Sequence, residues 1–259
     1  MKDFTFKKKF GQNFISDKNL LNAIVDDAQI TADDEVLEIG AGAGSLTQAL
    51  SARAKKVVSF EIDKDLCEHL NSLNLQNVNF VFDDFMKHSL DEIEANFEKE
   101  YKVVANLPYY ITTPIIFRFL EETKKCKSLT IMVQKEVAER VCAKEGGKDY
   151  GILTVMANFY GSPQINRIIK RQMFFPVPNV DSALLTIKLE PNKFGEVDSQ
   201  KFSKFIKACF SMRRKTLLNN LSTLYSKEKL KGVLDAQTLG KRAEQFSLEE
   251  FLQIFNKLS

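Results

Sequence analysis

Histidine, cysteine and long apolar runs are scarce in this 259-residue chain, and each scarcity excludes a class of protein. The two histidines, His69 and His88, stand in polar surroundings, so chemistry built on an imidazole base is not expected. The four cysteines lack C-x-x-C spacing, which argues against a zinc site or a disulfide framework and favours a cytoplasmic location. No apolar run approaches the roughly 20 residues of a membrane-spanning helix. The basic N-terminus has no apolar segment behind it, so no signal peptide is expected.

Charge is distributed unevenly along the chain, although the formal net charge is only +3. Residues 192–259 contain 13 Lys and Arg against 7 Asp and Glu, whereas the remainder contains 24 basic and 27 acidic residues. A basic C-terminal part favours a polyanionic partner such as nucleic acid. Charge alone fits a solvated helical surface equally well.

The first 190 residues alternate between strand-like and helix-like patterns. Strands are expected at 35–39, 56–61, 78–82, 101–106, 128–133, 164–171 and 182–189. Helices are expected at 45–52, 64–73, 89–97, after Pro114, and at 135–143 and 152–160. Repeated β-α units predict an α/β fold with a parallel sheet covered on both faces. From Pro191 the pattern is helical to the end, which predicts two domains, 1–191 and 192–259.

A glycine-rich turn follows the first of these strands. The run Gly40-Ala41-Gly42-Ala43-Gly44 opens a helix and lets a ligand approach the backbone closely, although such a turn alone is weak evidence. Glu61 ends the second strand, where a carboxylate accepts hydrogen bonds from ribose hydroxyls. Asp83 and Asp84 end the third strand and either cap the next segment or bind an exposed adenine amine. Together the three sites favour S-adenosylmethionine over a nicotinamide cofactor.

The fourth strand ends in the motif Asn106-Leu107-Pro108-Tyr109. The Asn106 side-chain oxygen and the Leu107 carbonyl are each suited to accept one hydrogen from an adenine N6 amine. Pro108 restricts Leu107 to an extended conformation, and Tyr109 offers a ring on which the base stacks. These features predict methyl transfer to N6 of adenine, whereas Tyr110 is expected in the core. The simpler alternative is that Asn106 caps a turn and Pro108 ends a strand.

Together with three further motifs, these residues resemble the ribosomal RNA adenine N6,N6-dimethyltransferase family over almost the whole chain. The N-L-P-Y form is similar to the branch that acts on small-subunit RNA, whereas the erythromycin-resistance relatives more often contain N-I-P-Y or N-I-P-F. The further motifs are Phe10-Gly11-Gln12-Asn13-Phe14, Phe174-x-Pro176-x-Pro178-x-Val180-x-Ser182 and Phe210-Ser211-Met212-Arg213-Arg214-Lys215-Thr216.

The resemblance implies a Rossmann-like class I methyltransferase domain followed by a small all-helical RNA-binding domain. It implies dimethylation of two adjacent adenosines in a hairpin loop near the 3′ end of 16S ribosomal RNA, by a monomer acting on the 30S subunit or its precursor, without a metal. Phe174 is expected beside the target base, with Phe175 as the one-residue alternative. The expected cofactor contacts are Asn13, Ile15, Gly40, Glu61, Asp84 and Asn106. The expected RNA contacts are Lys7, Lys8, Lys9, Lys204, Lys207, Arg213, Arg214 and Lys215.

Other functions remain open at this point. An adenine methyltransferase acting on DNA or large-subunit RNA needs the same pocket. A non-catalytic factor in ribosome assembly or transcription would keep the fold, although the intact cofactor residues argue against one. A nicotinamide-dependent oxidoreductase is the most distant alternative.

Overall fold

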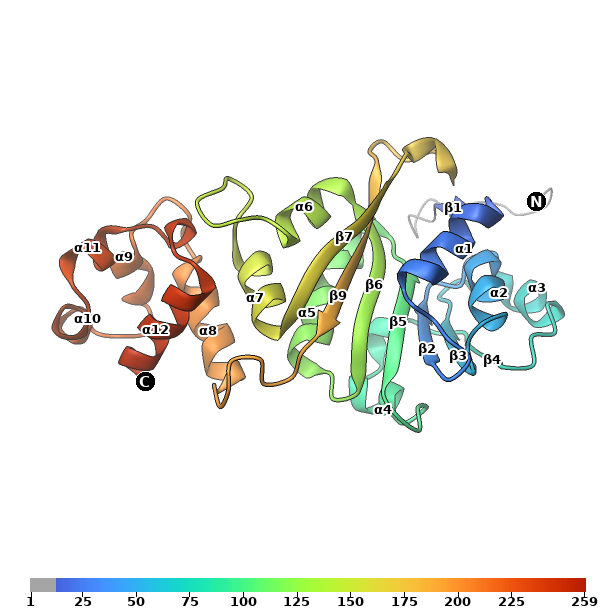
Figure 1. The fold of residues 1–259 in the computed structure, drawn as a ribbon, viewed down its shortest axis with the longest axis horizontal. Coiled ribbons are helices and arrows are strands. Elements are labelled where there is room, and N and C mark those ends of the chain that lie inside the picture. The colour runs from blue at the N-terminus through green and yellow to red at the C-terminus, as the bar shows by residue number, and fades with distance from the viewer. Residues whose placement is uncertain (1–12) are drawn as a thin grey trace. The chain divides into compact units, whose positions relative to one another are not determined.

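The computed structural model describes residues 13–259 (Figure 1). The predicted RNA contacts Lys7, Lys8 and Lys9 and the start of the N-terminal motif lie outside the described residues. The chain forms two compact units: the first runs to Ala138 and includes 164–189, and the second comprises 139–163 and 190–259. The predicted division at residue 191 therefore separates 139–163 from the helices with which this segment packs.

A seven-stranded sheet forms the centre of the first unit, in the order β4-β3-β2-β5-β6-β9-β7. The strands from β4 to β6 are parallel, whereas β9 pairs antiparallel with β6. Val57, Val58, Val103 and Val104 are fully buried, as expected for strands covered on both faces. The strands are β2 (Glu35–Ile39), β3 (Lys56–Phe60), β4 (Val78–Val81), β5 (Tyr101–Asn106), β6 (Cys126–Gln134), β7 (Gly161–Ile169) and β9 (Ser182–Leu189).

Helices in the first unit follow the strands, as the β-α pattern predicts. They are α2 (Ser45–Ser51), α3 (Cys67–Ser72), α4 (Leu90–Glu94) and α5 (Thr112–Glu122), with 3₁₀ turns η2 (Lys64–Leu66), η3 (Phe85–Lys87) and η4 (Tyr109–Ile111). Helix α1 (Lys18–Asp27) was not anticipated, although Asp17 caps it and Leu21, Ile24 and Val25 form its buried face.

A second, two-stranded sheet joins distant parts of the first unit. Strand β1 (Phe14–Ile15) pairs antiparallel with β8 (Phe174–Phe175), and Figure 1 shows this blue strand meeting the gold segment after β7. This pairing attaches the N-terminal motif to the predicted target loop.

The second unit is mainly helical, as predicted for the C-terminal part. Phe202 and Phe205 of α8 pack with Phe251 and Phe255 of α12, and Phe159 of α7 contacts Phe202. This aromatic packing explains why 139–163 groups with the C-terminal helices. Helix α6 (Lys135–Val141) begins in the first unit and ends in the second. The other helices of the second unit are α7 (Ile152–Tyr160), α8 (Ser199–Cys209), α9 (Leu217–Leu221), α10 (Lys227–Val233), α11 (Ala236–Gly240) and α12 (Leu248–Leu258). Within residues 13–259, no helix is long and apolar enough to cross a membrane.

Candidate active site

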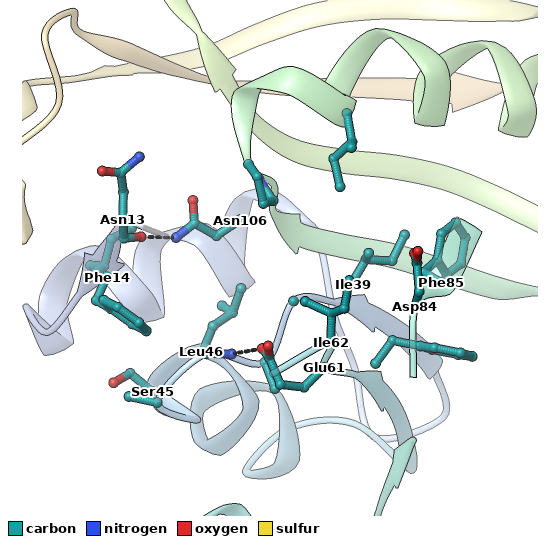
Figure 2. Close-up of a pocket in the computed structure, with 18 of the residues that line it drawn as sticks. Asn13, Phe14, Ile39, Ser45, Leu46, Glu61, Ile62, Asp84, Phe85 and Asn106 are labelled. Carbon is teal, nitrogen blue, oxygen red and sulfur yellow. Dashed lines mark hydrogen bonds between the residues drawn. The ribbon is translucent and has the colours of Figure 1, made fainter. Parts of the chain in front are cut away.

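Four predicted site residues lie in a row at one edge of the main sheet. Gly40 follows β2, Glu61 follows β3, Asp84 comes shortly after β4, and Asn106 ends β5. Because these strands are adjacent and parallel, the row runs in the order Asp84, Glu61, Gly40, Asn106 across roughly 14 Å, at about 4.8 Å per strand. All four line one pocket (Figure 2), so the topology brings together residues that are up to 66 positions apart.

The N-terminal motif forms a further wall of this pocket. Asn13, Phe14 and Ile15 all line it, and contact of Asn13 and Ile15 with a cofactor remains a prediction. In the β1–β8 pair, Ile15 lies opposite Phe174, and both are buried at 5% and 3% exposure. Phe174 is therefore a core residue here and does not line the pocket, whereas Phe175 is 56% exposed. The role of Phe174 beside the target base remains a prediction.

The glycine turn approaches the pocket so closely that a side chain would close part of it. Gly42 has a φ of +56°, and an added Cβ would lie 2.9 Å from Cε1 of Phe14. The Gly42 backbone N–H donates a 2.7 Å hydrogen bond to Oε2 of Glu61. Glycine is required here both by the left-handed backbone and by the nearby ring.

Glu61 is buried and holds the turn in place. Its carboxylate accepts hydrogen bonds from the backbone N–H groups of Gly42 and, at 2.8 Å, of Asp63. Burial raises the pKa of Glu61, and these two N–H groups oppose the rise. Each carboxylate oxygen has further acceptor capacity, which suits the two hydroxyls of a ribose.

The structure distinguishes the two neighbouring aspartates, although both line the pocket. Asp83 accepts a hydrogen bond from the Asp84 backbone N–H at 2.8 Å and pairs with His88 at 3.1 Å, and these contacts lower its pKa. Within the described part of the chain, the Asp84 carboxylate accepts through Oδ1 alone, from the Met86 backbone N–H at 2.9 Å, and so caps η3. The second oxygen of Asp84 supports the predicted adenine contact at this residue rather than at Asp83.

Asn106 is oriented by the N-terminal motif. Its Nδ2 donates a 2.7 Å hydrogen bond to the backbone carbonyl of Asn13, and Figure 2 shows its side-chain oxygen pointing away from that carbonyl. Within the part of the chain that the structure describes, this oxygen has no hydrogen-bond donor, so it remains an acceptor for a substrate amine. Pro108 lines the pocket next to Asn106, whereas the Leu107 side chain is buried and outside the lining.

The two tyrosines after Pro108 lie in different environments, and stacking of Tyr109 on the target base remains a prediction. Tyr109 does not line the pocket; its hydroxyl lies 2.8 Å from Oγ of Ser182, the last residue of the target-loop motif. Tyr110 lines the pocket and is 62% exposed, so the expectation that it lies in the core is wrong. A 3₁₀ turn over Tyr109–Ile111 replaces the strand geometry, so the two rings lie in different environments.

Several lining residues were not identified from the sequence. Ile62 and Met86 are partly exposed apolar side chains next to Glu61 and near Asp84, where they suit the faces of a planar base. Their place in the sequence, one residue after Glu61 and two residues after Asp84, could have identified them as pocket residues. Ser45 and Leu46 at the start of α2, and Ile111, also line the pocket.

A buried carboxyl, Glu38, supports the glycine turn from behind. Its Oε2 accepts hydrogen bonds from the hydroxyls of Thr47 and Ser59 at 2.7 and 2.6 Å, whereas Oε1 has no partner within the described chain. Burial raises the pKa of Glu38 to about 7. The carboxyl therefore changes charge close to neutral pH.

Glu38→Gln is expected to flatten the pH dependence of stability. The pKa of Glu38 is higher in the folded protein than in the unfolded chain, so the folded protein holds a proton that the unfolded chain has lost between these two values. The contribution of Glu38 to the free energy of unfolding is therefore fully present below pH 4.5 and is lost as the pH rises through about 7. The loss amounts to on the order of 3 kcal/mol, and Gln mimics the neutral acid. Urea unfolding at pH 5 and pH 8 measures it, with the exposed Glu228→Gln as control. An unchanged difference between the two pH values in Glu38→Gln would contradict this assignment.

The donor set fits S-adenosylmethionine. An acidic residue stands at each position where the nucleoside needs one, the turn at Gly42 leaves room for a ligand against the backbone, and the pocket walls are largely apolar. Across residues 13–259, no group of His, Cys, Asp and Glu is arranged to hold a metal ion.

The basic residues of the second unit are exposed. Lys204 and Lys207 lie on the outer face of α8, whose opposite face buries Phe202, Phe205 and Ile206. The predicted basic segment, Arg213-Arg214-Lys215, follows α8 and is exposed, with Arg213 donating to the carbonyl of Lys148.

Comparison with known proteins agrees with this geometry. The family described as ribosomal RNA adenine dimethylase matches residues 3–259. The ribosomal RNA small subunit methyltransferase A of Caldanaerobacter subterraneus is 45% identical, over 97% of each chain. The crystal structure of a dimethyladenosine transferase from Plasmodium falciparum is similar with a TM-score of 0.79 and 26% identity, over 95% of this chain and 98% of that one. The 23S rRNA methyltransferase ErmE is similar with a TM-score of 0.72 and 27% identity, over 95% and 99%. The chain belongs to the ribosomal RNA adenine dimethylase family.

Proposed function

We propose that this enzyme dimethylates the N6 amines of two adjacent adenosines in a hairpin loop near the 3′ end of 16S ribosomal RNA. Its substrate would be the 30S subunit or its precursor, which also implies a cytoplasmic location and a role in subunit biogenesis; we propose that it acts as a monomer. The supporting observation is the oriented Asn106 side-chain oxygen, at the end of a row of cofactor-binding positions.

Adenine N6 is a poor nucleophile because its lone pair is delocalised into the ring. When bound, S-adenosylmethionine supplies an electrophilic methyl group on a sulfonium. In this proposal Asn106 accepts one N6 hydrogen through Oδ1, and the backbone carbonyl of Leu107 accepts the other. These two bonds draw the nitrogen towards tetrahedral geometry and direct its lone pair. Alkylation makes the remaining N–H acidic, so its proton passes to water without a strong protein base.

Orientation of the target amine is expected to supply much of the rate enhancement of methyl transfer. Well-oriented groups contribute up to roughly 7–11 kcal/mol to lowering a barrier. The hydrogen bond from Asn106 to the Asn13 carbonyl provides such an orientation, because it prevents the amide from presenting its N–H₂ to the base. Asp84 would hold the adenine of the cofactor, Glu61 its ribose and Gly40 its amino-acid part, with Asn106 left to hold the methyl acceptor.

RNA is held by phosphate contacts, and the target base must leave its stack, which costs a few kcal/mol and favours a loop. The triple change Arg213→Ala, Arg214→Ala and Lys215→Ala is expected to weaken RNA binding and to reduce the slope of log affinity against log salt by about 2–3. Fluorescence anisotropy with a labelled hairpin at several salt concentrations measures this.

A charge-matched control separates this segment from net charge. Lys227, Lys231 and Lys257 are exposed lysines elsewhere in the second unit, and their replacement by Ala removes the same charge. The control is expected to change the slope much less. Equal effects of the two triple variants would show that the basic segment is not a specific contact.

The main rival substrate is large-subunit RNA, because ErmE, to which the chain is 27% identical, is named a 23S rRNA methyltransferase. The curated relatives at 41–45% identity are named for the small subunit, which favours the proposal. Transfer of tritiated methyl groups to separated ribosomal subunits tests it. Label in small-subunit RNA is expected, whereas label confined to large-subunit RNA would refute the proposed substrate.

A further inference from the structure

Arg118 of α5 is a largely but not fully buried cation that lies next to the cofactor pocket and outside its lining. Its side chain is 11% exposed. Its guanidinium donates to the backbone carbonyl of Phe85 at 3.2 Å and to the carbonyl of His88. The same group lies over the Phe85 ring, 5.2 Å from the centroid. Three contacts of Arg118 therefore converge on one four-residue segment.

That segment carries the adenine-binding end of the pocket. Asp84 caps η3, and Phe85 and His88 stand within and directly after this turn. The Phe85 ring is also held by Phe60 and Phe119, at 5.5 and 6.0 Å. Among residues 13–259, the Met86 N–H is the one hydrogen-bond donor to the Asp84 carboxylate, so the position of this carboxylate depends on the turn.

A turn of three residues is too short to hold its own shape. Its backbone bonds are Lys87 N–H to the Asp84 carbonyl and His88 N–H to the Phe85 carbonyl, at 3.0 and 3.3 Å. Arginine suits the task of bracing it, because a planar fork reaches two carbonyls while its face stacks on a ring, which a lysine ammonium does not do. A cation at the carbonyl end of a helical turn is also electrostatically favourable.

We propose that Arg118 is a positioning residue that fixes the turn carrying Asp84 and thereby sets the preference of the enzyme for the adenine base of its cofactor. The inference rests on the proposed contact between Asp84 and the adenine amine. It adds a residue from α5, the helix that begins directly after the Tyr109–Ile111 turn. Helix α5 therefore contacts the adenine end of the pocket through Arg118 and continues directly from the turn that follows the methyl-acceptor motif.

Calorimetric titration of the full chain with two ligands tests the proposal. S-adenosylhomocysteine presents an amine at the purine 6-position, whereas S-inosylhomocysteine presents a carbonyl oxygen that a carboxylate repels. The unsubstituted protein is expected to prefer the adenine ligand by about tenfold or more. Arg118→Lys is expected to lose most of this preference, through weaker binding of the adenine ligand and little change for the other.

Matched variants distinguish positioning from general damage to the fold. Glu122→Gln removes the 3.5 Å ion pair of Arg118 but leaves its carbonyl contacts, so this variant is expected to keep the full preference. Arg118→Gln serves if Arg118→Lys does not fold, as judged by its melting transition. An unchanged preference, or an equal loss of affinity for both ligands, overturns the role of Arg118. Equal affinity of both ligands for the unsubstituted protein refutes the Asp84 contact and this inference, while leaving RNA methylation standing.

Discussion

Asn106→Ala is expected to lower kcat for methyl transfer by about 10²–10³-fold, while cofactor affinity changes only a few-fold. The oxygen that is lost is the side-chain acceptor that the Asn13 carbonyl orients towards a substrate amine. The cofactor keeps Glu61, Asp84 and the glycine turn. Single-turnover transfer to small-subunit particles measures the rate, and titration with S-adenosylhomocysteine measures binding.

Two further variants define what Asn106 contributes. Asn106→Asp keeps an acceptor oxygen but replaces the donor that bonds Asn13 with a second oxygen, so it is expected to be nearly as slow. Asn219→Ala removes an exposed asparagine whose side chain donates to the Thr216 hydroxyl, and it is expected to leave the rate unchanged. Near-normal turnover in Asn106→Ala would show that the side chain is only a turn cap.

Gly42→Ala is expected to weaken cofactor binding by about 100-fold, a loss of roughly 2.7 kcal/mol. The new Cβ would meet the Phe14 ring at 2.9 Å, and relief of that contact moves either the ring into the pocket or the Gly42 N–H away from Glu61. The left-handed backbone adds about 1–2 kcal/mol of strain for any residue with a Cβ. Calorimetric titration and urea unfolding measure the two effects separately.

Gly146→Ala is the matched control for backbone strain. Gly146 also has a positive φ, +78°, but an added Cβ would meet no atom within 4 Å. This variant is expected to lose stability while retaining cofactor affinity. If Gly42→Ala binds cofactor as tightly as Gly146→Ala does, the close approach of the turn to the ligand is not important for binding.

The strands and the row of site residues were predictable because their signals are local. Apolar runs ending in Glu61, Asp84 and Asn106 define both the strand and the residue at its carboxyl end. Parallel pairing then brings those ends to one edge without further information. The same reasoning also gave the class of cofactor, because acidic groups at adjacent strand ends match a nucleoside.

Features that depend on distant pairing were not predictable. The β1–β8 pair joins residues about 160 positions apart and decides that Phe174 is buried whereas Phe175 is exposed. Alternation in a two-residue strand is too short to give this orientation. The hydroxyl contact between Tyr109 and Ser182 likewise links two motifs that the sequence presents separately.

The division into two units could not be predicted correctly from local patterns. Segment 139–163 follows the β-α pattern of the preceding residues, so its sequence placed it with the sheet. Its Phe159 instead packs against Phe194 and Phe202. These aromatic contacts between distant segments place 139–163 in the second unit, and the local pattern does not reveal them. Helix α1 is the opposite case, because its Asp17 cap and its apolar spacing are local signals from which it could have been predicted.

The most direct test of N6 dimethylation is mass spectrometry of nucleosides from small-subunit particles incubated with the protein and S-adenosylmethionine. N6,N6-dimethyladenosine is expected, localised to two adjacent positions in a hairpin near the 3′ end of 16S RNA, and absent when Asn106→Ala replaces the unsubstituted protein. Adenosine that stays unmodified in the presence of folded, cofactor-binding protein would contradict the assignment.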